Sequence, residues 1–90
     1  MEKAIHSAEY QAFLQVLREL REQQGITQVE LAQKLTKSHR SITQSLVSKL
    51  ERGEVRLDII QLRWLCQEMG VSLSAFVERL ERRLARKVKS

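Results

Sequence analysis

Hydrogen-bonding and cationic side chains follow one face of a short helix predicted near residues 44–52. Helical spacing turns Leu46, Val47 and Leu50 to the opposite, buried face and leaves no acid on the polar one. An amide can bond to adenine, an ammonium group to guanine and a hydroxyl to either base. The chemistry that this pattern favours is hydrogen bonding to base edges in a DNA groove. The polar face consists of Gln44, Ser45, Ser48, Lys49 and Arg52.

No spacing in the chain indicates catalysis or a metal site. His6 and His39 lie far apart, and neither has a cluster of Cys, His or acidic residues around it. Cys66 falls on the inward side of a predicted helix, so we expect a small core residue rather than a reactive thiol. No glycine-rich phosphate loop occurs either. We therefore expect a protein that is not an enzyme and that needs no cofactor and no metal.

Positive charge is concentrated in two segments, although the net charge is only +5. Residues 34–56 hold six Lys or Arg against two Glu, and residues 79–90 hold six against one. Segments 1–33 and 57–78 are each net acidic. This segregation favours a polyanion as partner, because counterions are released when cations meet phosphates. A solvated basic tail is the alternative interpretation of the second segment.

Length and composition predict one all-helical domain over residues 1–90. Proline is absent, glycine occurs three times, and 42% of the residues are hydrophobic. We expect no membrane span, since no run of 18 apolar residues occurs, and no signal peptide. The single cysteine cannot form an internal disulfide, so a cytoplasmic location is expected.

Capping signals and glycines mark five helices. The stretches Thr27–Glu30 and Asp58–Gln61 are capping-box patterns that start two of them. Gly25, Gly53 and Gly70 each come after an apolar-periodic stretch, where a helix is expected to end. The predicted helices span about 8–24, 28–35, 44–52, 59–69 and 73–87.

Three blocks of sequence resemble the Cro/repressor (Xre-like) helix-turn-helix domain. They are GITQVELA at 25–32, VSKLERG at 47–53, and the stretch 65–76 with MGVSL at its centre. The resemblance implies a compact, five-helix lambda-repressor-like DNA-binding domain, with its core at about 8–78 and a basic C-terminal helix or tail at 79–90. The third helix of such a domain enters the major groove, and the second lies across the DNA backbone.

The resemblance also implies DNA contacts for individual residues. Gln44, Ser45 and Lys49 match base-contacting positions, and Ser48 lies beside them. Gln28 begins the second helix and matches a phosphate-contacting position, where free backbone N–H groups favour an anion. Lys37 and Arg40 precede the third helix and are expected either on phosphates or in solvent. The full set expected at the DNA backbone is Thr27, Gln28, Lys37, Arg40, Thr43, Arg52 and Arg56.

Arg21 and Glu51 match a buried ion pair that, in relatives, ties the first helix to the end of the third. We expect the same pair here, and we expect that losing either partner alone is strongly destabilising.

The segment between the second and third helices departs from the family pattern. Relatives have a three- or four-residue turn that begins with glycine, whereas 36–42 contains no glycine and adds about five residues. Either an enlarged loop precedes a third helix that begins at Thr43, or a tight turn is kept and the helix begins at Ser38. The second register puts Thr36 and Lys37 where a glycine and an apolar residue are required. We therefore favour the enlarged loop.

An apolar stripe on the fifth predicted helix exceeds what a core of this size needs. Phe76 can serve the core while part of the stripe meets a second copy of the chain. We expect a homodimer that presents its two third helices to half-sites about one DNA turn, roughly 34 Å, apart on a pseudo-palindromic operator. The stripe consists of Leu73, Val77, Leu80 and Leu84.

These expectations favour a sequence-specific, double-stranded DNA-binding transcriptional regulator, a repressor of bacterial or phage type that is associated with the nucleoid. An antitoxin, which would bind both DNA and a toxin protein, is one alternative. A module on the same scaffold that binds only protein is another. Duplex binding at two salt concentrations separates the last alternative from DNA readout, and co-purification of a small basic protein would favour the antitoxin.

Overall fold

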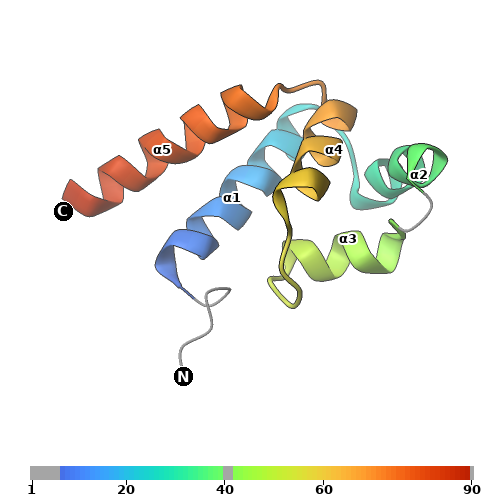
Figure 1. Ribbon diagram of the computed structural model, residues 1–90, viewed down its shortest axis with the longest axis horizontal. Helices are drawn as coiled ribbons and strands as arrows, with labels where there is room; N and C mark the ends of the chain where they lie inside the picture. Colours follow the sequence, from blue (N-terminus) through green and yellow to red (C-terminus); the bar gives the residue numbers. More distant parts are fainter. Residues whose placement is uncertain (1–6, 40–41, 90) are drawn as a thin grey trace.

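The computed structural model describes residues 7–39 and 42–89, with side chains as far as residue 86. Within these ranges the chain forms five helices and no strand, so the all-α prediction is confirmed (Figure 1). The helices are α1 (Ala8–Gln23), α2 (Gln28–Ser38), α3 (Gln44–Glu51), α4 (Ile59–Met69) and α5 (Leu73–Lys89). None of these helices is long and apolar enough to cross a membrane.

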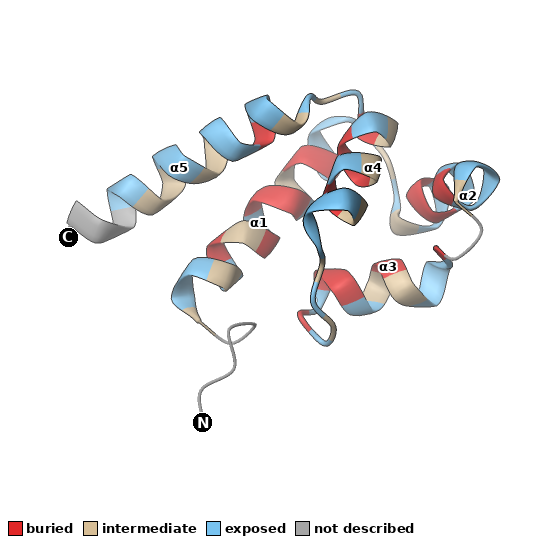
Figure 2. Cartoon of the chain, in the orientation of Figure 1, coloured by how far each residue is buried: buried red, intermediate tan, exposed pale blue. Residues whose placement is uncertain are grey.

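α1 runs through the middle of the molecule, between α5 on one side and α3 on the other (Figure 1). α2 packs against α3 and α4, and α4 also packs against α5. Buried residues gather where these helices face one another, whereas most of α5 is half-buried or exposed (Figure 2). The three shorter helices, α2, α3 and α4, therefore depend on packing, because a helix of two or three turns is not stable alone in water. The core includes Val16, Leu17, Leu31, Leu35, Val47, Leu65, Cys66 and Phe76.

Both predicted capping boxes are confirmed. The Thr27 hydroxyl accepts a hydrogen bond from the Glu30 backbone N–H at 3.1 Å, and the Glu30 carboxylate accepts one from the Thr27 N–H at 2.9 Å. Asp58 and Gln61 exchange the same two bonds, at 2.7 and 3.1 Å. Each box satisfies N–H groups that the first turn leaves without a helical partner, which fixes where α2 and α4 begin.

The end of α2 differs from the prediction. The helix continues to Ser38 instead of ending near 35, so the extra residues are divided between one more turn of α2 and a connection over 39–43. The alternative in which α3 begins at Ser38 is wrong, since that residue closes α2. Without a glycine to end α2 the helix continues, and the Thr36 hydroxyl lies 2.8 Å from the Ala32 carbonyl oxygen and 2.6 Å from that of Ile42. Ile42 is itself buried, which anchors the chain just before α3.

Polar contacts fasten α5 to α1. Arg83 and Arg79 donate to the Glu19 carboxylate at 2.7 and 3.4 Å, and the same guanidinium groups donate to Gln15 and Gln23 at 3.2 Å. The Arg83 guanidinium, with Arg79, holds the pKa of the Glu19 carboxyl below its usual value. The basic segment that begins at residue 79 is therefore not simply a solvated tail, because two of its arginines belong to this seam.

Candidate nucleic-acid interface

α3 is built with one buried and one exposed side. Thr43 caps its start, with its hydroxyl accepting a hydrogen bond from the Leu46 N–H at 3.2 Å. Val47 and Leu50 are buried against the core side. The predicted base-contacting residues lie on the outer side of this one short helix, three of them exposed and one half-buried. The exposed residues are Gln44, Ser45 and Lys49, and the half-buried residue is Ser48.

A tight turn ends α3 and sets the position of the residues after it. The Gly53 N–H donates to the Leu50 carbonyl at 3.1 Å, and the Glu54 N–H donates to the Lys49 carbonyl at 2.9 Å, which is the Schellman arrangement. Gly53 has φ 76°, and a Cβ atom at this position would lie 3.0 Å from Leu14 Cδ1. Only glycine fits both the positive φ and the close approach of Leu14 without strain. The position of Glu54 relative to α3 is therefore set by the backbone.

Arg52, expected on a phosphate, is paired within the chain. Its Nε donates to Glu54 Oε2 at 2.7 Å and its Nη2 to Glu54 Oε1 at 3.2 Å, while Nη1 donates to the Ser48 hydroxyl. The hydrogen bond between them raises the pKa of Arg52 and lowers that of Glu54. The sequence predicts DNA contacts for Arg52 and Ser48, but it does not predict that Glu54 binds Arg52. The signal available was an acid and a base on either side of the Gly53 turn.

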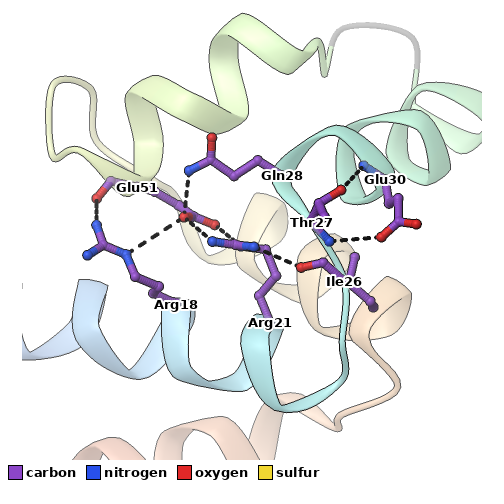
Figure 3. A network of polar contacts seen from close by, with 7 residues as sticks. All are labelled: Arg18, Arg21, Ile26, Thr27, Gln28, Glu30 and Glu51. Atoms are coloured by element: carbon purple, nitrogen blue, oxygen red, sulfur yellow. Dashed lines mark hydrogen bonds and ion pairs between the residues drawn. The ribbon is translucent and has the colours of Figure 1, made fainter.

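A buried ion pair holds α3 against α1. Arg21 Nε donates to Glu51 Oε2 at 2.6 Å and Nη2 donates to Oε1 at 3.0 Å (Figure 3). The two side chains are only 11% and 2% exposed. Arg21 Nη1 also donates to the Ile26 carbonyl at 2.8 Å, in the turn before α2. The structure thus brings the two predicted partners together and adds a contact from Arg21 to the turn before α2.

Gln28 and Arg18 complete the network around Glu51. Gln28 Nε2 donates to Glu51 Oε1 at 2.9 Å, so its amide nitrogen is engaged inside the protein while its oxygen points away from that carboxylate (Figure 3). Arg18 Nη2 donates to the Glu51 carbonyl at 3.4 Å. A single carboxylate therefore connects α1, α2 and α3. The family resemblance predicts that Gln28 contacts a phosphate, but it does not predict the hydrogen bond from its amide nitrogen to Glu51.

Tyr10 supports the loop that carries Arg56. The Leu57 N–H donates to the Tyr10 hydroxyl at 3.1 Å, and the Arg56 guanidinium carbon lies 5.8 Å from the centre of the Tyr10 ring. Arg56 itself is exposed. The loop cation is thus held over an aromatic face, an arrangement that attracts it electrostatically.

The other residues expected at the DNA backbone lie around α2, as far as the structure describes them. Lys37 is exposed in the last turn of α2, where with Thr36 and Gln44 it lines a shallow hollow between α2 and α3. Thr27 is exposed but uses its hydroxyl to cap α2. Arg40 lies outside the described residues.

The apolar stripe of α5 is divided between the core and the surface. Leu73 and Leu80 are half-buried and pack against the core cluster. Leu84 is half-buried in an apolar hollow formed with α1 and the start of α4. Val77 is 40% exposed. Of the four residues predicted at a dimer interface, Val77 is therefore the one most available to a second copy.

Within 7–39 and 42–89, no three His, Cys, Asp or Glu residues are gathered as metal ligands would be. Cys66 is buried in the core, and burial raises the pKa of its thiol to about 11. A thiol with this pKa is protonated at neutral pH and is a poor nucleophile.

A comparison with protein families agrees with this architecture. The family model described as helix-turn-helix matches residues 17–76, about two thirds of the chain. The matched stretch contains all of α2, α3 and α4. No curated protein and no solved structure matches the chain significantly.

Proposed function

The chain belongs to the helix-turn-helix family, and from this premise we propose that it is a sequence-specific regulator that binds double-stranded DNA as a dimer and represses transcription. α3 is the recognition helix and enters the major groove, while α2 lies across the DNA backbone. Two copies related by a two-fold axis read half-sites about one turn of DNA, roughly 34 Å, apart.

The observation that carries the proposal is the outer side of α3. Gln44, Ser45 and Lys49 are exposed there, on a helix that the buried Arg21–Glu51 pair holds against α1. An amide, a hydroxyl and an ammonium group are the donors and acceptors that match base edges in the major groove. A rigid support under such groups favours readout, because contacts to bases need a fixed orientation.

Cations and helix ends around α3 supply the contacts to phosphates. Lys37 precedes the recognition helix, whereas Arg52 and Arg56 come after it, so positive charge lies on both sides of the base-contacting residues. The N-terminus of α2 adds backbone N–H groups that favour an anion. The residues that we assign to the DNA backbone are Thr27, Gln28, Lys37, Arg40, Thr43, Arg52 and Arg56.

Selection from a random pool of duplexes tests the proposal directly. We expect a two-fold symmetric sequence to be enriched, and its affinity to fall steeply with salt because phosphate contacts release counterions. Gln44→Ala should change which sequences are bound and should weaken the binding free energy for the selected duplex by about 1–3 kcal/mol. Gln67→Ala, an exposed amide on α4, is the matched control.

Charge removal tests the phosphate contacts separately. Replacing Lys37 and Arg40 by neutral residues should flatten the salt slope by about two units if both contact phosphate. An unchanged slope would remove them from the interface. A protein that ignores duplex DNA at every salt concentration would contradict the whole proposal and favour a module that binds only protein.

A further inference from the structure

Glu54 pairs with the guanidinium group of Arg52 at the end of the recognition helix. Its carboxylate accepts two hydrogen bonds from Arg52, at 2.7 Å from Nε and 3.2 Å from Nη2. A guanidinium binds a phosphate through the same pair of parallel N–H donors. With Nη1 donating to the Ser48 hydroxyl, all three guanidinium nitrogens that a DNA phosphate could use already have a partner within the protein.

The backbone places Glu54 at this position. Its N–H closes the turn after α3 by donating to the Lys49 carbonyl at 2.9 Å, and Gly53 before it cannot accept a side chain without strain. The carboxylate consequently stands among cations, with Arg52 bound to it and the charge of Lys49 also lowering its pKa. The acid is ionised at neutral pH and competes with any other anion for Arg52.

The same guanidinium reaches the base-contacting side of α3. Nη1 of Arg52 donates to the hydroxyl of Ser48, which is one turn earlier on the helix. One hydrogen-bonded cluster thus joins a predicted base-contacting residue, Ser48, to a predicted phosphate-contacting residue, Arg52, and to the acid Glu54. If Arg52 changes its partner, the hydrogen bond to Ser48 is also affected.

We propose that Glu54 is an internal competitor of the DNA phosphate for Arg52. The inference rests on the proposed DNA-binding function and adds a regulating residue to it. In the free protein the carboxylate neutralises Arg52. In the complex a phosphate replaces the carboxylate.

The exchange is physically accessible because the pair is exposed. The side chains of Arg52 and Glu54 are 52% and 51% exposed, so water screens their attraction and the pair can open at little cost. Since phosphates carry no sequence information, the competition weakens binding to every duplex to a similar extent.

Glu54→Gln tests the inference. We expect this variant to bind duplex DNA about two- to fivefold more tightly than the wild type at low salt, which is the size of effect that exposed pairs produce. The gain should be similar on the selected sequence and on an unrelated one, and it should shrink at high salt. Fluorescence anisotropy with labelled duplexes measures the affinity for each sequence at each salt concentration. Glu78→Gln, on exposed α5, removes the same charge and is the matched control, for which we expect a smaller gain.

A double-mutant cycle decides whether Glu54 acts through Arg52. In an Arg52→Gln background, the additional change Glu54→Gln should raise the affinity for DNA by no more than the Glu78→Gln control does. A gain that persists without Arg52, a gain no larger than that of the control, or a loss of affinity would each overturn the inference while leaving the proposed function intact. If the wild type binds no duplex, the proposed function fails and this inference fails with it. Circular dichroism of each variant checks that the helices are retained.

Discussion

His39 stacks on Trp64, with the ring centroids 3.8 Å apart and the ring planes 12° from parallel. His39 caps the C-terminus of α2, and Trp64 lies on α4. The contact therefore fixes the end of the additional turn of α2, at the point where the chain leaves towards α3. Together with the Thr36 hydroxyl near the Ile42 carbonyl, this contact explains how the long connection still holds α3 in place.

Removing the imidazole ring should loosen this connection. We expect His39→Ala to lower the free energy of unfolding by about 0.5–1.5 kcal/mol, the range for a pair of stacked rings. His39→Phe should retain most of this stabilisation, because its ring can still stack on Trp64. Urea unfolding measures the loss. Trp64 is the only tryptophan, so its fluorescence reports the environment of the stack directly. Lys37→Ala, at an exposed neighbouring position, is the control, and an unchanged spectrum and midpoint in His39→Ala would contradict the prediction.

Local signals explain what could be predicted from the sequence. Thr27 and Asp58 mark helix starts because a capping box needs only residues three apart. α2 continues past its predicted end because no glycine follows residue 35 to stop it. The contact that fixes the new end comes from Trp64, which is distant in sequence from His39. Tertiary contacts of this kind override local preference.

In the candidate site, too, local patterns are predictable from the sequence and tertiary contacts are not. Periodicity placed Gln44 and Lys49 on the outer side of α3, because that depends only on helical spacing. Sequence alone could not show that Gln28 would bond to Glu51 or Arg52 to Glu54. A sequence shows which groups can donate a hydrogen bond, whereas the acceptor that each one meets is decided by packing.

The Arg21–Glu51 pair should be costly to break from one side. Arg21→Ala leaves a buried carboxylate without its main partner, so we expect a loss of about 3–5 kcal/mol in the free energy of unfolding. Arg18→Ala is the matched control, because its half-exposed side chain contacts Glu51 only at 3.4–3.9 Å and should cost less than about 1 kcal/mol. Urea unfolding followed by circular dichroism measures both. Equal midpoints for the two variants would show that the buried pair does not stabilise the fold.

Acid should weaken the seam between α1 and α5. The pKa of Glu19 is lower in the folded protein, mainly through the hydrogen bond from Arg83, so its contribution is present above the unfolded pKa of about 4.3 and is lost as pH falls through the folded value. Because Glu19 is partly exposed, we expect this contribution to be well below about 1 kcal/mol. The difference in unfolding free energy between wild type and Glu19→Gln should therefore be positive at pH 7 and close to zero at about pH 3. Glu22→Gln, exposed on the same helix, is the control, and a difference that grows on acidification would refute the assignment.

The proposed dimer is best tested at Val77. Leu80 packs against the core of its own chain, so a charge there would unfold the monomer and could not separate folding from association. Val77 is exposed, so Val77→Glu should keep the helix content seen by circular dichroism while producing monomers in sedimentation. Such monomers should also bind the selected duplex more weakly, because one half-site is lost. Ala85→Glu puts the same charge at an exposed position of α5 outside the stripe and should remain dimeric. Dimers that persist in Val77→Glu would place the interface on another face, and a monomeric wild type would contradict the dimer itself.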